Sequence, residues 1–379
     1  MLIHHSAEDY GVAAKRAADW ATAKMESMIE SGKQRAIATI QEVQRMQPKD
    51  YLVPSDALVF APTETGVSAT FWPPSSHQDP SQATFTFHPH ALEQVGERCD
   101  MPNPKRTIGW LLSGENGARD LAQVLNHKYA QSEKKKYLVR AVNGNEIRGF
   151  LSDRFRRLDS SPIVESFVER IIAHGAIPTE GRALDTKFYL KVVLPHVLEP
   201  IPGEVMLWGA LLKNSDFGDG KLEISGFVHR LRCTNLAISE DGFSKVHLGG
   251  RLSEDMEFSK RTYELDTQTT ASAVKDVVDA VFEPANVRRR MEIIQHLGKE
   301  NTDADAVLKG LRTKSKLTKA EAEEVATLFS SAEIEMLPPG QTAWRLSNAI
   351  ALLAQKSEPH RQLDLEELAG EVAGLRKAA

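Results

Sequence analysis

The pattern of apolar and polar residues is most informative in residues 204–233, EVMLWGALLKNSDFGDGKLEISGFVHRLRC. Residues 205–212 are apolar except for Gly209, and such a run predicts a strand that is buried on both faces. Residues 214–220 are rich in Asn, Asp, Ser and Gly, which predicts a tight reversal of the chain. The apolar residues of the return run change face at Gly226, which predicts a β-bulge there. We therefore expect a central β-hairpin, and this stretch contains no catalytic motif.

Apolar residues at helical spacing predict amphipathic helices on both sides of this hairpin. The first such helix spans residues 12–46 and ends before Pro48. A second hairpin is predicted across residues 136–151, because Asn143-Gly144 is a strong signal for a two-residue turn. Further helices are predicted at residues 89–98, 107–131 and 163–174 and through most of the chain after residue 267, and a further strand at residues 188–194.

Strands and helices occur in blocks rather than in strict alternation, which favours an α+β fold over a doubly wound sheet. We expect antiparallel β-hairpins to form a core sheet backed by helices, with helical N-terminal and C-terminal appendages. The 379 residues are too many for one ordinary domain. The predicted division is an N-terminal helical arm at residues 1–50, an α+β core domain at residues 51–268 and a C-terminal helical domain at residues 269–379.

Composition predicts a cytoplasmic protein, located in the host cell's cytoplasm if a phage encodes it. The chain is 41% hydrophobic and 26% charged, as is common for globular proteins. No apolar run approaches the ~20 residues that a membrane helix needs, and the first residues lack the pattern of a signal peptide. Cys99 and Cys233 have no CxxC spacing, which excludes a structural zinc site built on thiolates.

Charge is distributed unevenly along the chain. The formal net charge is -5, but residues 105–157 contain twelve basic and five acidic residues. A second basic stretch covers residues 288–316. Segregated charge of this kind can form a local anion-binding surface on an otherwise acidic protein. The alternative is that these cations lie on ordinary solvated faces of helices and hairpins.

No motif for a known chemistry is present. The chain contains no P-loop, Rossmann or nucleophile-elbow pattern, and no histidine pair has the HExxH spacing. His229 and Cys233 are too few for a metal site, and catalytic carboxylates cannot be picked out among 52 acids. We therefore assign no catalytic residue, no metal and no cofactor, and the sequence favours a protein that is not an enzyme without deciding the question.

The basic hairpin is the best functional candidate, because it interleaves cations with aromatic residues. Guanidinium and ammonium groups bind phosphates while aromatic rings stack on bases, which suits single-stranded nucleic acid. The alternative is that the aromatic residues belong to the core and the arginines only border it. The predicted nucleic-acid-binding residues are Lys134, Lys135, Lys136, Arg140, Arg148, Phe150, Arg154, Phe155, Arg156 and Arg157.

Four segments resemble, in the same order, motifs of the phage/plasmid-like proteins that share a domain of unknown function, number 932 in its series. They are RGFLSDRFRRLD at residues 148–159, WGALLKNSDFG at 208–218, FVHRLRCTN at 227–235 and WRLSNA at 344–349. Asp216 stands where that family has glutamate, Phe155 where it has tyrosine, and Leu236 where it has glycine. The resemblance runs from about residue 84 to the end of the chain.

Three functions follow as hypotheses. The resemblance implies a phage or mobile-element protein, with a role in DNA metabolism or recombination. The first hypothesis is thus a nucleic-acid-binding protein that serves as a single-strand annealing or recombination accessory factor, since hairpins backed by a helix are also similar to the Rad-type and Bet-type annealing proteins. The second is a phage structural or assembly protein, and the third is a nuclease-type enzyme. Under the first two we expect a homo-oligomer larger than a dimer, whose subunits meet mainly through the terminal helices.

Overall fold

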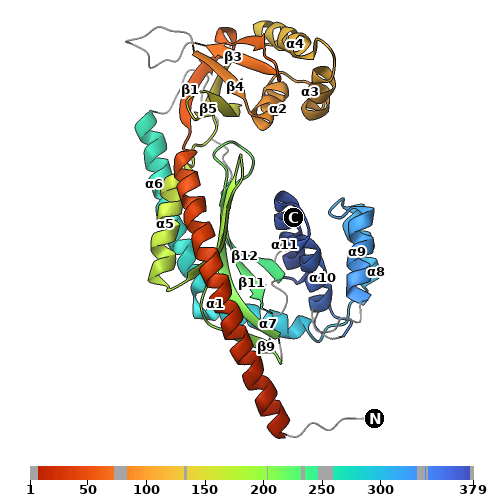
Figure 1. The fold of residues 1–379 in the computed structure, drawn as a ribbon. Coiled ribbons are helices and arrows are strands. Elements are labelled where there is room, and N and C mark those ends of the chain that lie inside the picture. The colour runs from red at the N-terminus through yellow and green to blue at the C-terminus, as the bar shows by residue number, and fades with distance from the viewer. Residues whose placement is uncertain are drawn as a thin grey trace.

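A computed structural model describes residues 7–71, 83–131, 135–202, 204–231, 235–245, 259–330, 338 and 340–375. The described chain forms an α+β fold, as the block pattern predicts, but its strands form two separate sheets rather than one core sheet. Each sheet belongs to its own lobe, and the long first helix α1 (Ala7–Arg45) runs along the larger one (Figure 1). No helix of the described residues is long and apolar enough to cross a membrane.

The first lobe contains a six-stranded sheet in the order β1-β5-β6-β4-β3-β2. Its neighbouring strands are antiparallel except for β4 and β6, which are parallel. The strands are β1 (Lys49–Pro54), β2 (Val59–Pro62), β3 (Val67–Phe71), β4 (Ala83–Phe87), β5 (Lys136–Val142) and β6 (Glu146–Ser152). The helices of this lobe are α2 (Pro89–Arg98), α3 (Pro104–Leu112) and α4 (Gly117–Gln131).

Successive side chains of β5 point to opposite faces of the sheet, and those on one face belong to the core of the first lobe. Tyr137, Val139 and Ala141 join Phe150 of β6 in a cluster with residues of α2 and α4. The turn that joins β5 to β6 has positive φ at Asn143 and Gly144, +50° and +90°, which confirms the predicted hairpin. Val142 pairs with Glu146, so the turn has three residues, 143–145, and not the expected two.

The second lobe contains a sheet in the order β12-β11-β10-β8-β7, with β9 paired to β10. Its central pair β10 and β11 is buried along almost its whole length, so the predicted central hairpin is confirmed. Gly226 keeps a regular pairing with Ala210 of β10, so the predicted bulge in β11 is wrong. The irregularity lies on β12, because Ser225 pairs with Gly242 and Phe227 with Ile238, which leaves the extra residues on that strand. The strands are β7 (Ile177–Ala183), β8 (Phe188–Val193), β9 (Leu198–Ile201), β10 (Glu204–Asn214), β11 (Leu222–Arg230) and β12 (Asn235–Lys245).

Helices cover both faces of the second sheet (Figure 1). Trp208 of β10 points to α6 (Lys260–Phe282), where its indole N–H donates a 2.8 Å hydrogen bond to the carbonyl oxygen of Val281. The opposite face of β10 packs with Leu363 of α11. The remaining helices are α5 (Ser160–Ala173), α7 (Pro284–Leu297), α8 (Ala304–Thr313), α9 (Lys319–Ser330), α10 (Ala343–Gln355) and α11 (Pro359–Val372).

The two lobes divide the chain differently from the predicted domains. The predicted boundary between residues 268 and 269 falls inside α6. Helices after it share one apolar core with β8, β10 and β11. Trp344, Leu346 and Ile350 of α10 are at most 1% exposed. The C-terminal helices are therefore part of the second lobe and not an appendage, because their apolar faces pack on the sheet.

Candidate nucleic-acid interface

The predicted stacking residues on the basic hairpin are buried, so this part of the prediction is wrong. Phe150 is 0% exposed, and its ring centroid lies 4.8 Å from that of Tyr137. Phe155 is also buried and packs with Leu138 and Leu151. Neither ring offers a face to a base, because each completes a core between the sheet and its neighbours.

Arg140 does not face solvent either, and its predicted contact with phosphate is wrong. Its side chain is 1% exposed, and it lies between the two lobes. Nε donates to Asp50 at 2.8 Å and Nη2 donates to Asp159 at 2.5 Å. Nη1 donates to the backbone carbonyl oxygen of Asp216 at 2.9 Å. The guanidinium is thus fully engaged inside the protein.

The other predicted arginines divide into paired and exposed ones. Arg148 donates to Glu146 at 2.8 Å and to the carbonyl oxygen of Asp185 at 2.9 Å. Arg156 forms an ion pair with Asp266 of α6. These two arginines hold structural contacts within and between the lobes.

Arg157 also has structural partners. Its Nε lies 3.0 Å from Asp50, and its guanidinium lies 4.2 Å from the centroid of the Tyr263 ring. In contrast, Lys135, Lys136 and Arg154 are exposed. Lys134 lies outside the described residues.

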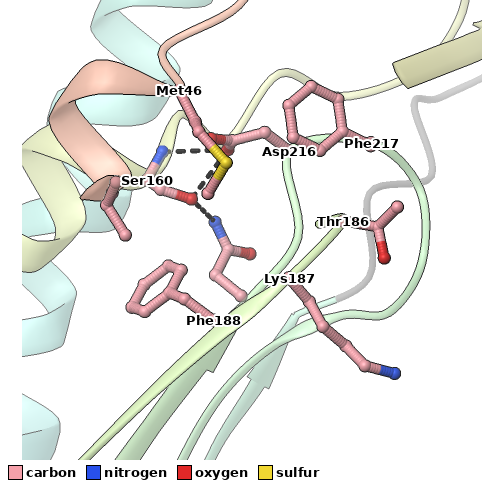
Figure 2. Close-up of a pocket in the computed structure, with 9 residues that line it drawn as sticks. Met46, Ser160, Thr186, Lys187, Phe188, Asp216 and Phe217 are labelled. Carbon is pink, nitrogen blue, oxygen red and sulfur yellow. Dashed lines mark hydrogen bonds between the residues drawn. The ribbon is translucent and has the colours of Figure 1, made fainter. Parts of the chain in front are cut away.

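Two of the four family-like segments meet at the joint between the lobes, which we define as Arg140, Asp50, Asp159, Ser160 and Asp216. Ser160 opens α5, directly after the segment at residues 148–159. Its backbone N–H and its hydroxyl donate to one carboxylate oxygen of Asp216, at 3.0 and 2.8 Å. Figure 2 shows this pair together with the cavity that it lines.

The loop between β10 and β11 enters the first lobe at this joint. The carbonyl oxygen of Phe217 accepts a 2.9 Å hydrogen bond from the side-chain amide of Gln94 in α2. Within the loop, the Ser215 hydroxyl accepts from the backbone N–H groups of Phe217 and Asp219, at 3.2 and 3.0 Å. The loop is therefore held rigidly, and it docks one lobe on the other.

Burial governs the ionisation of the joint. Burial raises the pKa of Asp216 to about 7, although the neighbouring Arg140 lowers it. Burial also lowers the pKa of Arg140, but the carboxyl groups of Asp50, Asp159 and Asp216 outweigh that effect and raise it. Arg140 thus stays charged, and Asp216 is the group of this joint that titrates near neutral pH.

Cations gather instead at one end of the first sheet. Tyr137 pairs with Ser152, the last residue of β6, so the lysines just before Tyr137 lie at the same end as Arg154. The ring of Tyr129, near the end of α4, lies 5.6 Å from that of Tyr137. Burial raises the pKa of both phenols, and Arg98 in the last turn of α2 lies near enough to lower it in part. We call this surface the cationic end: Arg98, Lys128, Lys135, Lys136 and Arg154.

The cationic end carries a local excess of positive charge. All five cations are exposed. Two acids, Asp100 and Asp153, lie near enough to Tyr137 to raise the pKa of its phenol. Within the described part of the chain, Arg98, Lys128, Lys135 and Arg154 form no salt bridge. Such a surface attracts an anion, because these four cations are not neutralised by a salt bridge within the described chain.

A second hollow lies between the loop after β10 and α11, with a volume of about 190 Å³. Its lysines already have partners, since Lys213 pairs with Glu367 and Lys187 lies 3.5 Å from Asp219. Among the described residues, no group of three or more His, Cys, Asp or Glu side chains is placed to hold a metal ion.

Sequence reasoning missed the partners of Arg140 and the contribution of Arg98. The strand KYLVRAV places Arg140 between Leu138 and Val142 on one face, and this apolar setting was a signal that the face is covered. Arg98 lies before the basic stretch in sequence and joins it only through the packing of α2 on the sheet. No family model matches the chain, and no curated protein or solved structure matches it either.

Proposed function

We propose that this protein binds single-stranded nucleic acid through the cationic end, as an annealing or recombination accessory factor of a phage or mobile element. The observation that carries the proposal is the gathering of five exposed cations from α2, α4, the start of β5 and the turn after β6 at one end of the first sheet. A nucleic-acid backbone supplies closely spaced negative charges that several cations on one surface can bind together.

Interaction with helix dipoles explains the positions of only some cations of the cationic end. Arg98 and Lys128 lie in the last turns of α2 and α4, where a cation interacts favourably with the helix dipole. Lys135 and Arg154 lie outside any helix, and no internal salt bridge of the described chain explains them. A bound phosphate gives these two side chains a partner, which supports an external ligand at this end of the sheet.

The test compares two triple variants by fluorescence anisotropy with labelled single-stranded and duplex oligonucleotides at several salt concentrations. Lys128→Ala, Lys135→Ala and Arg154→Ala together remove three exposed cations of the cationic end. We expect single-strand affinity to fall, and the log–log salt slope to flatten by about 0.7 for each phosphate that the variant no longer neutralises.

The matched control is Arg288→Ala, Lys309→Ala and Lys314→Ala, which removes three exposed cations of the second lobe. We expect it to bind like the wild type. No binding by the wild-type protein at micromolar concentration, binding independent of salt, or an equal decrease of affinity in both triple variants would overturn the proposal.

A further inference from the structure

Trp110 is the most exposed large apolar side chain of the described residues, at 73%. The other tryptophans with described side chains, Trp208 and Trp344, are buried in the second lobe. Trp110 lies on α3, whose buried residue is Ile108. Two residues along a helix turn the side chain by about 200°, so burial of Ile108 leaves Trp110 on the outer side.

The setting of Trp110 is cationic and polar. Lys105 and Arg106 are exposed on the same helix, and α3 contains no acidic residue. Arg106 precedes Trp110 by one helical turn and so lies on the same face. Gly109 next to it is exposed, and a Cβ there would meet nothing within 4 Å. An aromatic ring is thus presented beside two cations, with open space next to it.

This helix begins close to the cationic end. The ring of Pro104, its first residue, packs against Gly96 of α2, such that a Cβ on Gly96 would lie 2.9 Å from the Pro104 Cβ. Arg98, which belongs to the cationic end, lies in the last turn of α2, and only residues 99–103 separate it from Pro104, so the two residues are at most about 22 Å apart. A strand several nucleotides long can therefore contact both the cationic end and α3.

We propose that Trp110 is the base-stacking residue of the nucleic-acid site, with Arg106, one helical turn before it, binding the phosphate next to the stacked base and Lys105 adding positive charge at the start of α3. The inference rests on the proposed function, since it names a second contact of the same bound strand. Stacking on an exposed aromatic ring is tolerant of sequence, because every base has a flat face. It also requires an unpaired base, which gives the site its preference for single strands.

A protein partner fits this surface less well. Protein interfaces bury a contiguous patch with an apolar centre, whereas Trp110 stands alone among Lys105, Arg106, Gly109 and Ser113, all exposed. One planar ring with an arginine one turn before it on the same face is complementary to one base and its neighbouring phosphate. Charge therefore selects the nucleic-acid strand as the occupant.

The experiment measures oligothymidine binding by anisotropy and by tryptophan fluorescence. The fluorescence measurement uses a background with Trp20→Phe and Trp72→Phe, so that Trp110 is the exposed reporter among the described tryptophans. We expect Trp110→Ala to weaken binding at least about fivefold while the salt slope stays unchanged, since stacking involves no ion release. Trp110→Phe keeps a smaller ring and is expected to recover part of the affinity. In the background variant, the strand is expected to quench Trp110 fluorescence.

The matched control is Ile172→Ala, which truncates another exposed apolar side chain, 69% exposed on α5, and is expected to leave binding unchanged. Salt-dependent binding that is unaltered by Trp110→Ala, without quenching, would overturn this inference and leave the proposed function standing. Absence of any salt-dependent binding by the wild-type protein would overturn both.

Discussion

Arg140 in β5 donates a 2.9 Å hydrogen bond to the backbone carbonyl oxygen of Asp216, in the loop after β10, and so joins the two lobes directly. The same guanidinium holds Asp50 and Asp159. A residue that the basic stretch suggested as a phosphate ligand is thus the centre of the interlobe joint. Its removal tests the stability of the protein rather than its binding surface.

Arg140→Met is expected to destabilise the protein by about 1–3 kcal/mol, because the buried carbonyl oxygen of Asp216 loses its donor and the partly exposed carboxylates of Asp50 and Asp159 lose their cation. Equilibrium unfolding in urea measures this change. Arg154→Met removes an exposed arginine of the same segment and is expected to stay within about 0.5 kcal/mol of the wild type. Equal unfolding midpoints for the two variants would contradict the structural role of Arg140.

Asp216 is expected to make the folded protein less stable as the pH rises. Burial raises its pKa to about 7 from an ordinary value of 3.8, so the folded state binds this proton more tightly than the unfolded state. The resulting stabilisation is fully present below about pH 4 and is lost as the pH rises through about 7. Asp216→Asn cannot ionise, so its melting temperature relative to the wild type should increase from about pH 5 to about pH 9.

Calorimetry at three pH values, about 5, 7 and 9, checks this prediction. Asp120→Asn changes an exposed carboxyl group on α4 and serves as the control. A difference in melting temperature between Asp216→Asn and the wild type that stays constant with pH would show that Asp216 is already ionised at the lowest of these pH values.

Glycine substitutions are expected to separate backbone strain from steric collision. Gly144 and Gly218 both have positive φ, +90° and +80°. A Cβ on Gly144 meets nothing within 4 Å, whereas one on Gly218 lies 2.6 Å from Cδ2 of Leu151. Gly144→Ala should therefore cost about 1 kcal/mol through strain alone, and Gly218→Ala should cost more because it also forces the loop out of the joint.

Thermal unfolding measures which of the two variants loses more stability. Gly220, with φ +141° and its nearest atom at 4.0 Å, should behave like Gly144 when changed to Ala. If Gly218→Ala were the mildest of the three, the docking of the loop would be misassigned.

A homo-oligomer larger than a dimer stays a prediction, but the structure narrows the helices that could mediate it. The apolar stripe of α10 is covered within the chain, with Trp344 1% exposed. The N-terminal end of α1 extends beyond the second lobe (Figure 1). We therefore expect removal of residues 1–22 to reduce the assembly, as measured by light scattering. A mass of 42.0 kDa for the full chain at all concentrations would contradict an assembly.

Local signals determined much of the fold. Asn143-Gly144 specifies its turn because both positions adopt positive φ. Residues 205–212 are apolar on both faces and so specify a central strand, and Gly226 is required where a Cβ would lie 2.4 Å from the Trp208 ring. Each of these features depends on the backbone and on burial of nearby residues, which the local sequence encodes.

Only the tertiary structure decided which cations and aromatic rings are exposed. In β5 the residues on both faces are apolar apart from Arg140 and the first residue, Lys136, and alternation alone leaves open whether the face of Arg140 meets solvent or protein. The loop after β10, 76 residues later, covers that face and supplies the carbonyl oxygen that Arg140 binds. Trp110 is exposed because no segment of the described chain packs over its side of α3. Exposure is a property of the packed chain, because it depends on residues that are distant in sequence.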